Sequence, residues 1–100
     1  MKVRFLQSGG FLGLIKGCEF DTESLAPDLA EEVERLVRGC GISGSGEFLS
    51  DTGRDLQQYE ITIEDGTRTV SVTMDDASIL QSAKPMLGFL KKHALPKALT

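Results

Sequence analysis

The chain has 100 residues, a length that suits one domain, and 40% of them are hydrophobic, which suffices for a core without a stabilising metal or disulfide. Its 11 basic and 15 acidic residues leave a net charge of -4. Nucleic acids and anionic membranes are bound through an excess of Lys and Arg, so this charge argues against both as partners. We expect a single domain over residues 1–100 that binds neither nucleic acid nor membrane.

The first predicted elements are two strands joined by a glycine-rich turn. Apolar and polar side chains alternate over residues 2–7 and again over residues 14–21, so the two segments are expected to form an antiparallel hairpin. The first segment has no apolar block like that of a signal peptide. A membrane span needs about 20 apolar residues, and no apolar run in the chain approaches that length. We therefore expect a cytoplasmic protein, with export by a route that needs no signal peptide left open.

A helix is predicted after this hairpin. Pro27 suits a first helical turn, and apolar side chains then recur at helical spacing until Gly39 and Gly41 end the pattern. The segment that follows, residues 42–55, is rich in Gly, Ser and Asp, and it is predicted to form a long loop.

Residues 56–75 predict a second hairpin, because apolar and polar side chains alternate on both sides of a turn sequence. Residues 65–66 (Asp-Gly) are expected to form a two-residue type I′ turn. With that turn Ile61 would face Val70 and Tyr59 would face Val72, which places all four on the core face.

The last segment predicts a second helix, since Pro85 precedes apolar residues at helical spacing. The element order is then strand, strand, helix, strand, strand, helix (ββαββα). This order predicts an α+β two-layer sandwich, with a four-stranded antiparallel sheet and two helices on one face.

The sequence offers little catalytic chemistry. Its one histidine, His93, has no second metal ligand at helical spacing, and Cys18 and Cys40 do not form a CxxC pair. We interpret the cysteines as reduced and partly buried, with a disulfide as the alternative for an exported protein. The G-x-x-G-x-G pattern of residues 41–46 lacks the preceding strand and following helix of a dinucleotide site. We expect no enzyme activity, no metal and no cofactor.

The glycine turn "QSGGFLGLI" is the best candidate for a binding site, because its glycines surround two large apolar side chains, Phe11 and Leu12. Turns normally lie at the surface, where such side chains are out of place. Two readings are open at this point. Either Phe11 and Leu12 fold back onto the core, or at least one of them points outward as an anchor for a partner.

The order of these segments resembles the emfourin family, small bacterial proteins that inhibit protealysin-like metalloproteases, relatives of thermolysin. The resemblance covers nearly the whole chain, through "VRFLQSGGFLGL", "DTESLAPDLAEEVERLV", "QQYEITIEDGTRTVSVTMDD" and "AKPMLGFL". Its most specific part lies in residues 8–13, and it is loosest over residues 42–55.

The resemblance implies a protein inhibitor of a thermolysin-like (protealysin-like) zinc metalloprotease, and the zinc belongs to the protease. We expect the inhibitor to be a monomer when free. Such proteases favour a large apolar residue just after the bond they cut, so the Gly-rich loop would block the active-site cleft with an apolar anchor. The inhibitory loop would consist of Ser8, Gly9, Gly10, Phe11, Leu12 and Gly13.

Further contacts are expected from acidic and polar residues that would meet cationic groups beside the cleft. These candidate secondary contacts are Ser45, Glu47, Asp75 and Asp76. The alternative function is a non-inhibitory protein-binding or adaptor module on the same fold, because related sequences need not share a target.

Overall fold

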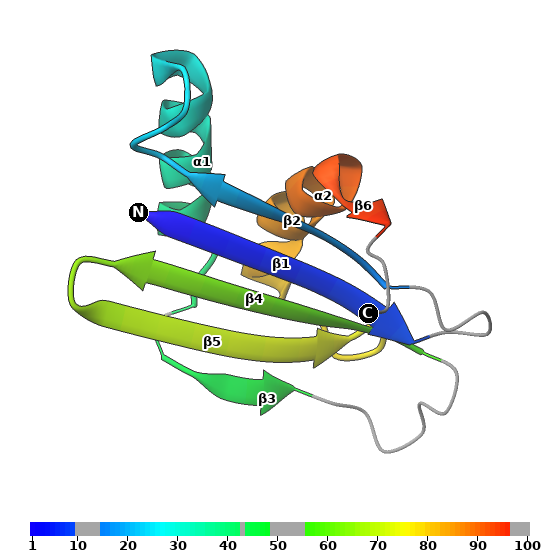
Figure 1. Cartoon of the computed structure of the whole chain (residues 1–100). Helices are drawn as coiled ribbons and strands as arrows, with labels where there is room; N and C mark the ends of the chain where they lie inside the picture. Colours follow the sequence, from blue (N-terminus) through cyan, green and yellow to red (C-terminus); the bar gives the residue numbers. More distant parts are fainter. Residues whose placement is uncertain (10–14, 43, 49–55, 97–100) are drawn as a thin grey trace.

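The computed structural model describes residues 1–9, 15–42, 44–48 and 56–96 of the chain. Within these residues there are six strands, two α-helices and one short 3₁₀ helix. In chain order the elements are β1 (Lys2–Gly9), β2 (Lys16–Asp21), α1 (Pro27–Gly39), β3 (Gly46–Phe48), β4 (Gln57–Asp65), β5 (Arg68–Asp75), η1 (Gln81–Ala83), α2 (Lys84–His93) and β6 (Leu95–Pro96) (Figure 1). The two helices and the four longer strands lie where the sequence pattern predicts them.

The described strands form one mixed sheet in the order β3-β5-β4-β1-β2-β6. β3 pairs with β5 in parallel, whereas the other neighbouring strands are antiparallel. The predicted four-stranded antiparallel sheet is therefore wrong, because one short strand is added at each edge of those four. β3 lies in the segment predicted to be a loop, and β6 follows the last helix. With three and two residues, these strands are too short to show an alternation in the sequence.

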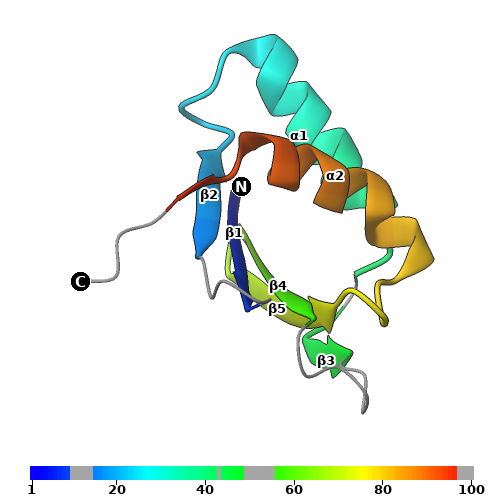
Figure 2. The same cartoon turned by 90° about the vertical axis from the view of Figure 1, so that its right-hand side faces the viewer.

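Both helices cover the same face of the sheet, which agrees with the predicted α+β arrangement (Figure 2). The core lies between the helices and that face. Its largest fully buried side chains are Tyr59, Phe5, Ile61, Met74, Leu90, Val3, Val72 and Cys40. Burial of these apolar side chains is the main force that holds the two layers together.

The β4–β5 hairpin has a different register from the predicted one. Its turn consists of residues 66–67, and Asp65 remains in the ladder opposite Arg68. Tyr59 therefore faces Met74, two residues further along β5 than predicted. A shift of two residues leaves every side chain on its predicted face, because side chains in a strand alternate with a period of two.

The backbone at the turn explains this register. Gly66 has a φ of 64°, and no other type of residue among those described has a positive φ. A type II′ turn needs a positive φ only at its first central position, which Gly66 occupies. The predicted type I′ turn would instead have required a positive φ at Asp65.

Neither cysteine forms a disulfide, and both thiols hydrogen-bond to backbone carbonyls. The Cys18 Sγ donates to the Leu90 carbonyl at 3.5 Å, and the buried Cys40 Sγ donates to the Val37 carbonyl at 2.9 Å. Among the residues that the structure describes, no helix is long and apolar enough to span a membrane.

The turn at Gly66 generates a stability prediction. Gly66→Ala forces a side chain into a left-handed backbone, so it should lower the free energy of unfolding by about 1–2 kcal/mol. As a control, Gly88→Ala lies in α2 with open space around the added methyl group, and it should raise stability by about 0.5–1 kcal/mol. Urea unfolding of both variants checks this. Equal stability of Gly66→Ala and wild type would contradict the observed turn.

Candidate functional site

The described part of the glycine turn lies at one end of the sheet. Ser8 and Gly9 are the last residues of β1, and Gly9 pairs with Gln57 at the start of β4. β5 ends beside that start, because Gln58 pairs with Asp75. We call this region the Gly9 end of the sheet, and it comprises Ser8, Gly9, Leu56, Gln57, Asp75 and Asp76.

Four further predicted loop residues, Gly10, Phe11, Leu12 and Gly13, lie outside the described residues. The described residues that flank them, Gly9 and Ile15, are both at the Gly9 end, since Gln7 pairs with Lys16. β3 also runs toward this end, because it is parallel to β5 (Figure 1). The described residues on both sides of the predicted inhibitory loop therefore lie at this end of the sheet.

Gly9 has two physical reasons to be glycine. Its φ is 91°, in the left-handed region of the backbone that residues other than glycine rarely adopt. A Cβ atom at this position would also lie 3.0 Å from the Leu56 carbonyl oxygen, which is a backbone atom with little freedom to move. The glycine lets the end of β1 pass close against the residue that precedes β4.

Gln57 is hydrogen-bonded on three sides at this point. Its Nε2 donates to the Gly9 carbonyl at 3.2 Å, and its Oε1 accepts from Gln7 Nε2 at 3.4 Å. Its backbone N–H donates to Asp76 Oδ2 at 3.1 Å, and its carbonyl accepts from the Asp76 N–H at 3.2 Å. Gln57 thus connects the end of β1 to the residue that follows β5.

Asp76 is an exposed residue, yet its carboxylate also reaches the core. The Tyr59 hydroxyl donates a hydrogen bond to Asp76 Oδ1, and Tyr59 itself is only 1% exposed. The ring of Tyr59 stacks with Phe5 at 6.3 Å between centroids. Lys91, from α2, completes the group with its Nζ 3.5 Å from the Tyr59 hydroxyl and 5.2 Å from the ring centroid.

This environment raises the pKa of Tyr59 well above its ordinary value. Burial is the largest cause, because it disfavours the charged phenolate. The hydrogen bond to Asp76 and the negative charge of that carboxylate add to the effect, since both favour a protonated hydroxyl. Tyr59 therefore acts as a neutral hydrogen-bond donor.

The predicted secondary contacts fall into separate places. Asp75 is only 3% exposed, and its Oδ1 accepts from the Ala77 N–H at 3.0 Å, so it stabilises the turn after β5. Asp76 is the member of that pair that reaches the surface. Ser45 and Glu47 lie at the β3 edge, where the Ser45 hydroxyl accepts from the Ser71 N–H at 3.0 Å and Glu47 is exposed opposite Thr73.

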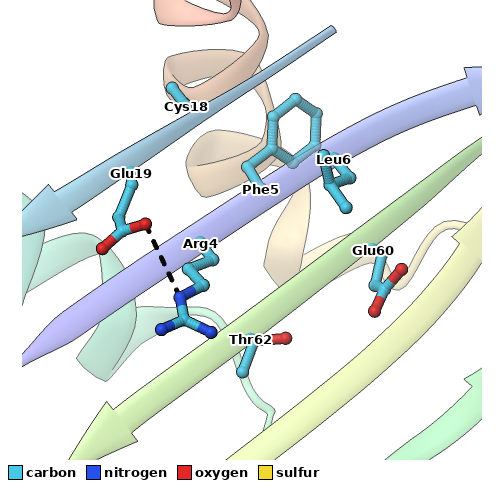
Figure 3. Close-up of a pocket in the computed structure, with 7 residues that line it drawn as sticks. All are labelled: Arg4, Phe5, Leu6, Cys18, Glu19, Glu60 and Thr62. Carbon is cyan, nitrogen blue, oxygen red and sulfur yellow. Dashed lines mark ion pairs between the residues drawn. The ribbon is translucent and has the colours of Figure 1, made fainter. Parts of the chain in front are cut away.

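A hollow of about 190 Å³ lies beside β1 and is lined by Arg4, Phe5, Leu6, Cys18, Glu19, Glu60 and Thr62 (Figure 3). Arg4 crosses it, with its Nε 3.6 Å from Glu19 Oε2. Leu6 is 36% exposed and pairs with Gly17 on one side and Glu60 on the other. The sequence does contain a sign of this feature, because Leu6 occupies a polar position in the alternation of β1.

Sequence reasoning missed the roles of Gln57, Tyr59 and Lys91 in this region. Their hydrogen bonds join residues that are 17 to 50 positions apart along the chain. No local pattern reports such partners. The only sign in the sequence is that residues 57–58, the first two of β4, are a polar pair.

Within the part of the chain that the structure describes, no group of three or more His, Cys, Asp or Glu side chains could hold a metal ion. What the structure does show is a small α+β protein with an extensively hydrogen-bonded sheet end next to a glycine-rich turn. The model of the emfourin family matches residues 5–91, so the chain belongs to that family, as the resemblance indicated. Its members are protein inhibitors of proteases, which makes a protease the general class of partner. Comparisons with curated proteins and with solved structures gave no significant match.

The raised pKa of Tyr59 can be measured directly, because the chain has one tyrosine and no tryptophan. The usual pKa of tyrosine is about 10. Somewhat above that pH, the absorbance of tyrosinate should be missing from the folded protein and should appear when the protein unfolds. The folded-state pKa is the higher one. The stability that Tyr59 contributes is therefore complete below the unfolded pKa and is lost as pH rises toward the folded value.

The control for this titration is Asp76→Asn, which removes the charge beside the hydroxyl. It should lower the pKa of Tyr59 toward the ordinary value, while burial keeps part of the rise. A folded wild-type protein whose tyrosine titrates normally would contradict the observed network.

Proposed function

We propose that this protein inhibits a thermolysin-like (protealysin-like) zinc metalloprotease by occupying its active-site cleft with residues 8–13. The observation that carries the proposal is the emfourin family match, which includes all of these residues. The location of Gly9 supports it, because the turn begins at a sheet end whose backbone is tied to the core through Gln57 and Asp76.

The chemistry of the turn suits this role. The cleft of such a protease accepts a large apolar side chain just after the bond it cuts, and Phe11 or Leu12 would supply one. Burial of one such side chain contributes about 1.5–3 kcal/mol, which corresponds to about one to two decades of affinity. Tight inhibition therefore requires contacts beyond the anchor.

Those further contacts must come from residues around the turn. A standard interface covers about 800 Å² on each partner, roughly an eighth of the 6441 Å² that this chain exposes. Asp76 lies at the Gly9 end, and Glu47 is exposed on the β3 edge strand. In this proposal the two carboxylates meet cationic groups beside the cleft, where complementary charge also speeds association.

The proposal is tested by titrating the purified protein into a protealysin-like protease. Wild type should inhibit with one-to-one stoichiometry, and Phe11→Ala or Leu12→Ala should weaken inhibition by about 10-fold to 100-fold. Thr67→Ala is the control, because Thr67 is exposed in the turn at the opposite end of the sheet.

The other outcomes of this titration are equally informative. If both variants still inhibit like wild type, the proposed function stands, but the main contact with the protease lies in another loop. If wild type inhibits no thermolysin-like protease, the proposed target is wrong, and a binding or adaptor role on this fold becomes the better description.

A further inference from the structure

We infer that Gln57 and Asp76 are positioning residues that hold the base of the inhibitory loop in one geometry, and so set its affinity and its resistance to cleavage. We call these two residues the brace. The inference rests on the proposed function, because it concerns how residues 8–13 are presented to a protease. It does not require either side chain of the brace to touch the reacting atoms.

The first part of the brace is the side chain of Gln57. Its amide nitrogen donates to the carbonyl of Gly9, the last described residue before the turn. A peptide unit is planar, so fixing this carbonyl also sets the direction in which the chain leaves Gly9. The amide oxygen accepts from Gln7 Nε2, which sets the orientation of the amide group.

The second part of the brace is Asp76, which holds the backbone of Gln57 in place. The N–H of Gln57 donates to the carboxylate of Asp76, and its carbonyl accepts from the N–H of the same residue. The other carboxylate oxygen accepts from Tyr59, whose side chain is buried and stacked on Phe5. An unbroken series of contacts therefore runs from the core to Gly9.

The amino-acid composition of the turn explains why such a brace matters. Glycine loses more conformational freedom on ordering than any other residue type, and three of the residues in positions 8–13 are glycines, so a bound conformation of this sequence carries a high entropy cost. A loop that is held in its bound conformation beforehand avoids part of this cost. A fixed base also hinders the approach to the transition-state geometry that cleavage requires.

The sharpest test replaces Gln57 with a side chain of the same shape. In Gln57→Glu the carboxylate can still accept from Gln7, but it cannot donate to the Gly9 carbonyl. Gln57→Glu and Gln57→Ala should each weaken inhibition by about 5-fold to 10-fold, the value of one hydrogen bond with the ordering it provides. Gln58→Ala is the matched control, because the neighbouring Gln58 is exposed and points to the other face of the sheet.

Two further readouts separate positioning from a general loss of stability. Amide hydrogen exchange of the free protein should become faster around residues 8–14 in both Gln57 variants, with α1 unchanged. On long incubation with protease, the variants should be cut within residues 8–14 sooner than wild type.

A double-mutant cycle between Gln57→Ala and Phe11→Ala adds a third readout. The two effects on inhibition should be non-additive, because Gln57 acts through the geometry of the loop that carries the anchor. Fully additive effects would overturn the inference, as would wild-type inhibition and exchange in Gln57→Glu.

Failure of the proposed function gives a different result from failure of the brace. If wild type does not inhibit a protealysin-like protease, the inhibitory role of the brace falls with that function. The exchange measurement on the free protein still decides the structural part. Unchanged exchange at residues 8–14 in the variants would show that Gln57 does not hold the base of the turn, whatever the partner is.

Discussion

The pairing of β1 with β4 is the constraint on which the rest of the molecule depends. These strands lie at the centre of the sheet and are in register from Lys2 with Glu64 to Gly9 with Gln57. A slip of one residue would turn the apolar side chains of one strand away from the helices, so burial enforces the register along its whole length. The same register brings Gly9 against Leu56 and Gln57. The position of the candidate site is therefore a consequence of core packing, and the site needs no separate device to place it.

One buried polar group stands out on the face of the sheet toward the helices. The buried side chains that β1 and β4 present there are apolar apart from the Tyr59 hydroxyl, which meets Asp76 and Lys91. An unpaired hydroxyl there would be costly, so the position of Asp76 follows from the need to satisfy a buried donor. A single carboxylate thus satisfies a core residue and a strand end at once. This shared use links the stability of the fold to the geometry of a surface loop.

The sequence predicts the parts of the fold that are governed by local periodicity. The alternation over residues 2–7, 14–21 and 56–75 locates four strands, the helical spacing after Pro27 locates one helix, and Pro85 locates the other. The sheet edges were not predictable, because β3 and β6 exist only through their partners β5 and β2. The register error at Gly66 had a different cause, since a glycine can be the second central residue of a type I′ turn or the first of a type II′ turn. Opposite charges on Asp65 and Arg68 favour the observed pairing across the ladder.

For the candidate site, too, the sequence predicts the features that depend on local pattern and misses those that depend on long-range contacts. Glycines mark the turn at residues 8–13, and membership of the emfourin family indicates a protease as the general class of partner. Gln57 and Asp76 stand 19 positions apart, and a single sequence carries no trace of their hydrogen bond. Long-range polar contacts of this kind are determined by the packed structure and not by local pattern, which is why they appear only once strands are placed side by side.

The two ends of the sheet differ in a way that has a practical consequence. The Gly9 end bears the glycine-rich turn, whereas the opposite end bears the short turn at Gly66 and the N-terminal residue, which accepts a hydrogen bond from Thr22 (Figure 1). The end of the sheet opposite Gly9 is therefore a suitable place to attach other molecules. A dye, a fusion partner or a solid support attached through the N-terminus or through position 67 would leave the Gly9 end pointing outward, so the protein could be immobilised as an affinity reagent in a uniform orientation.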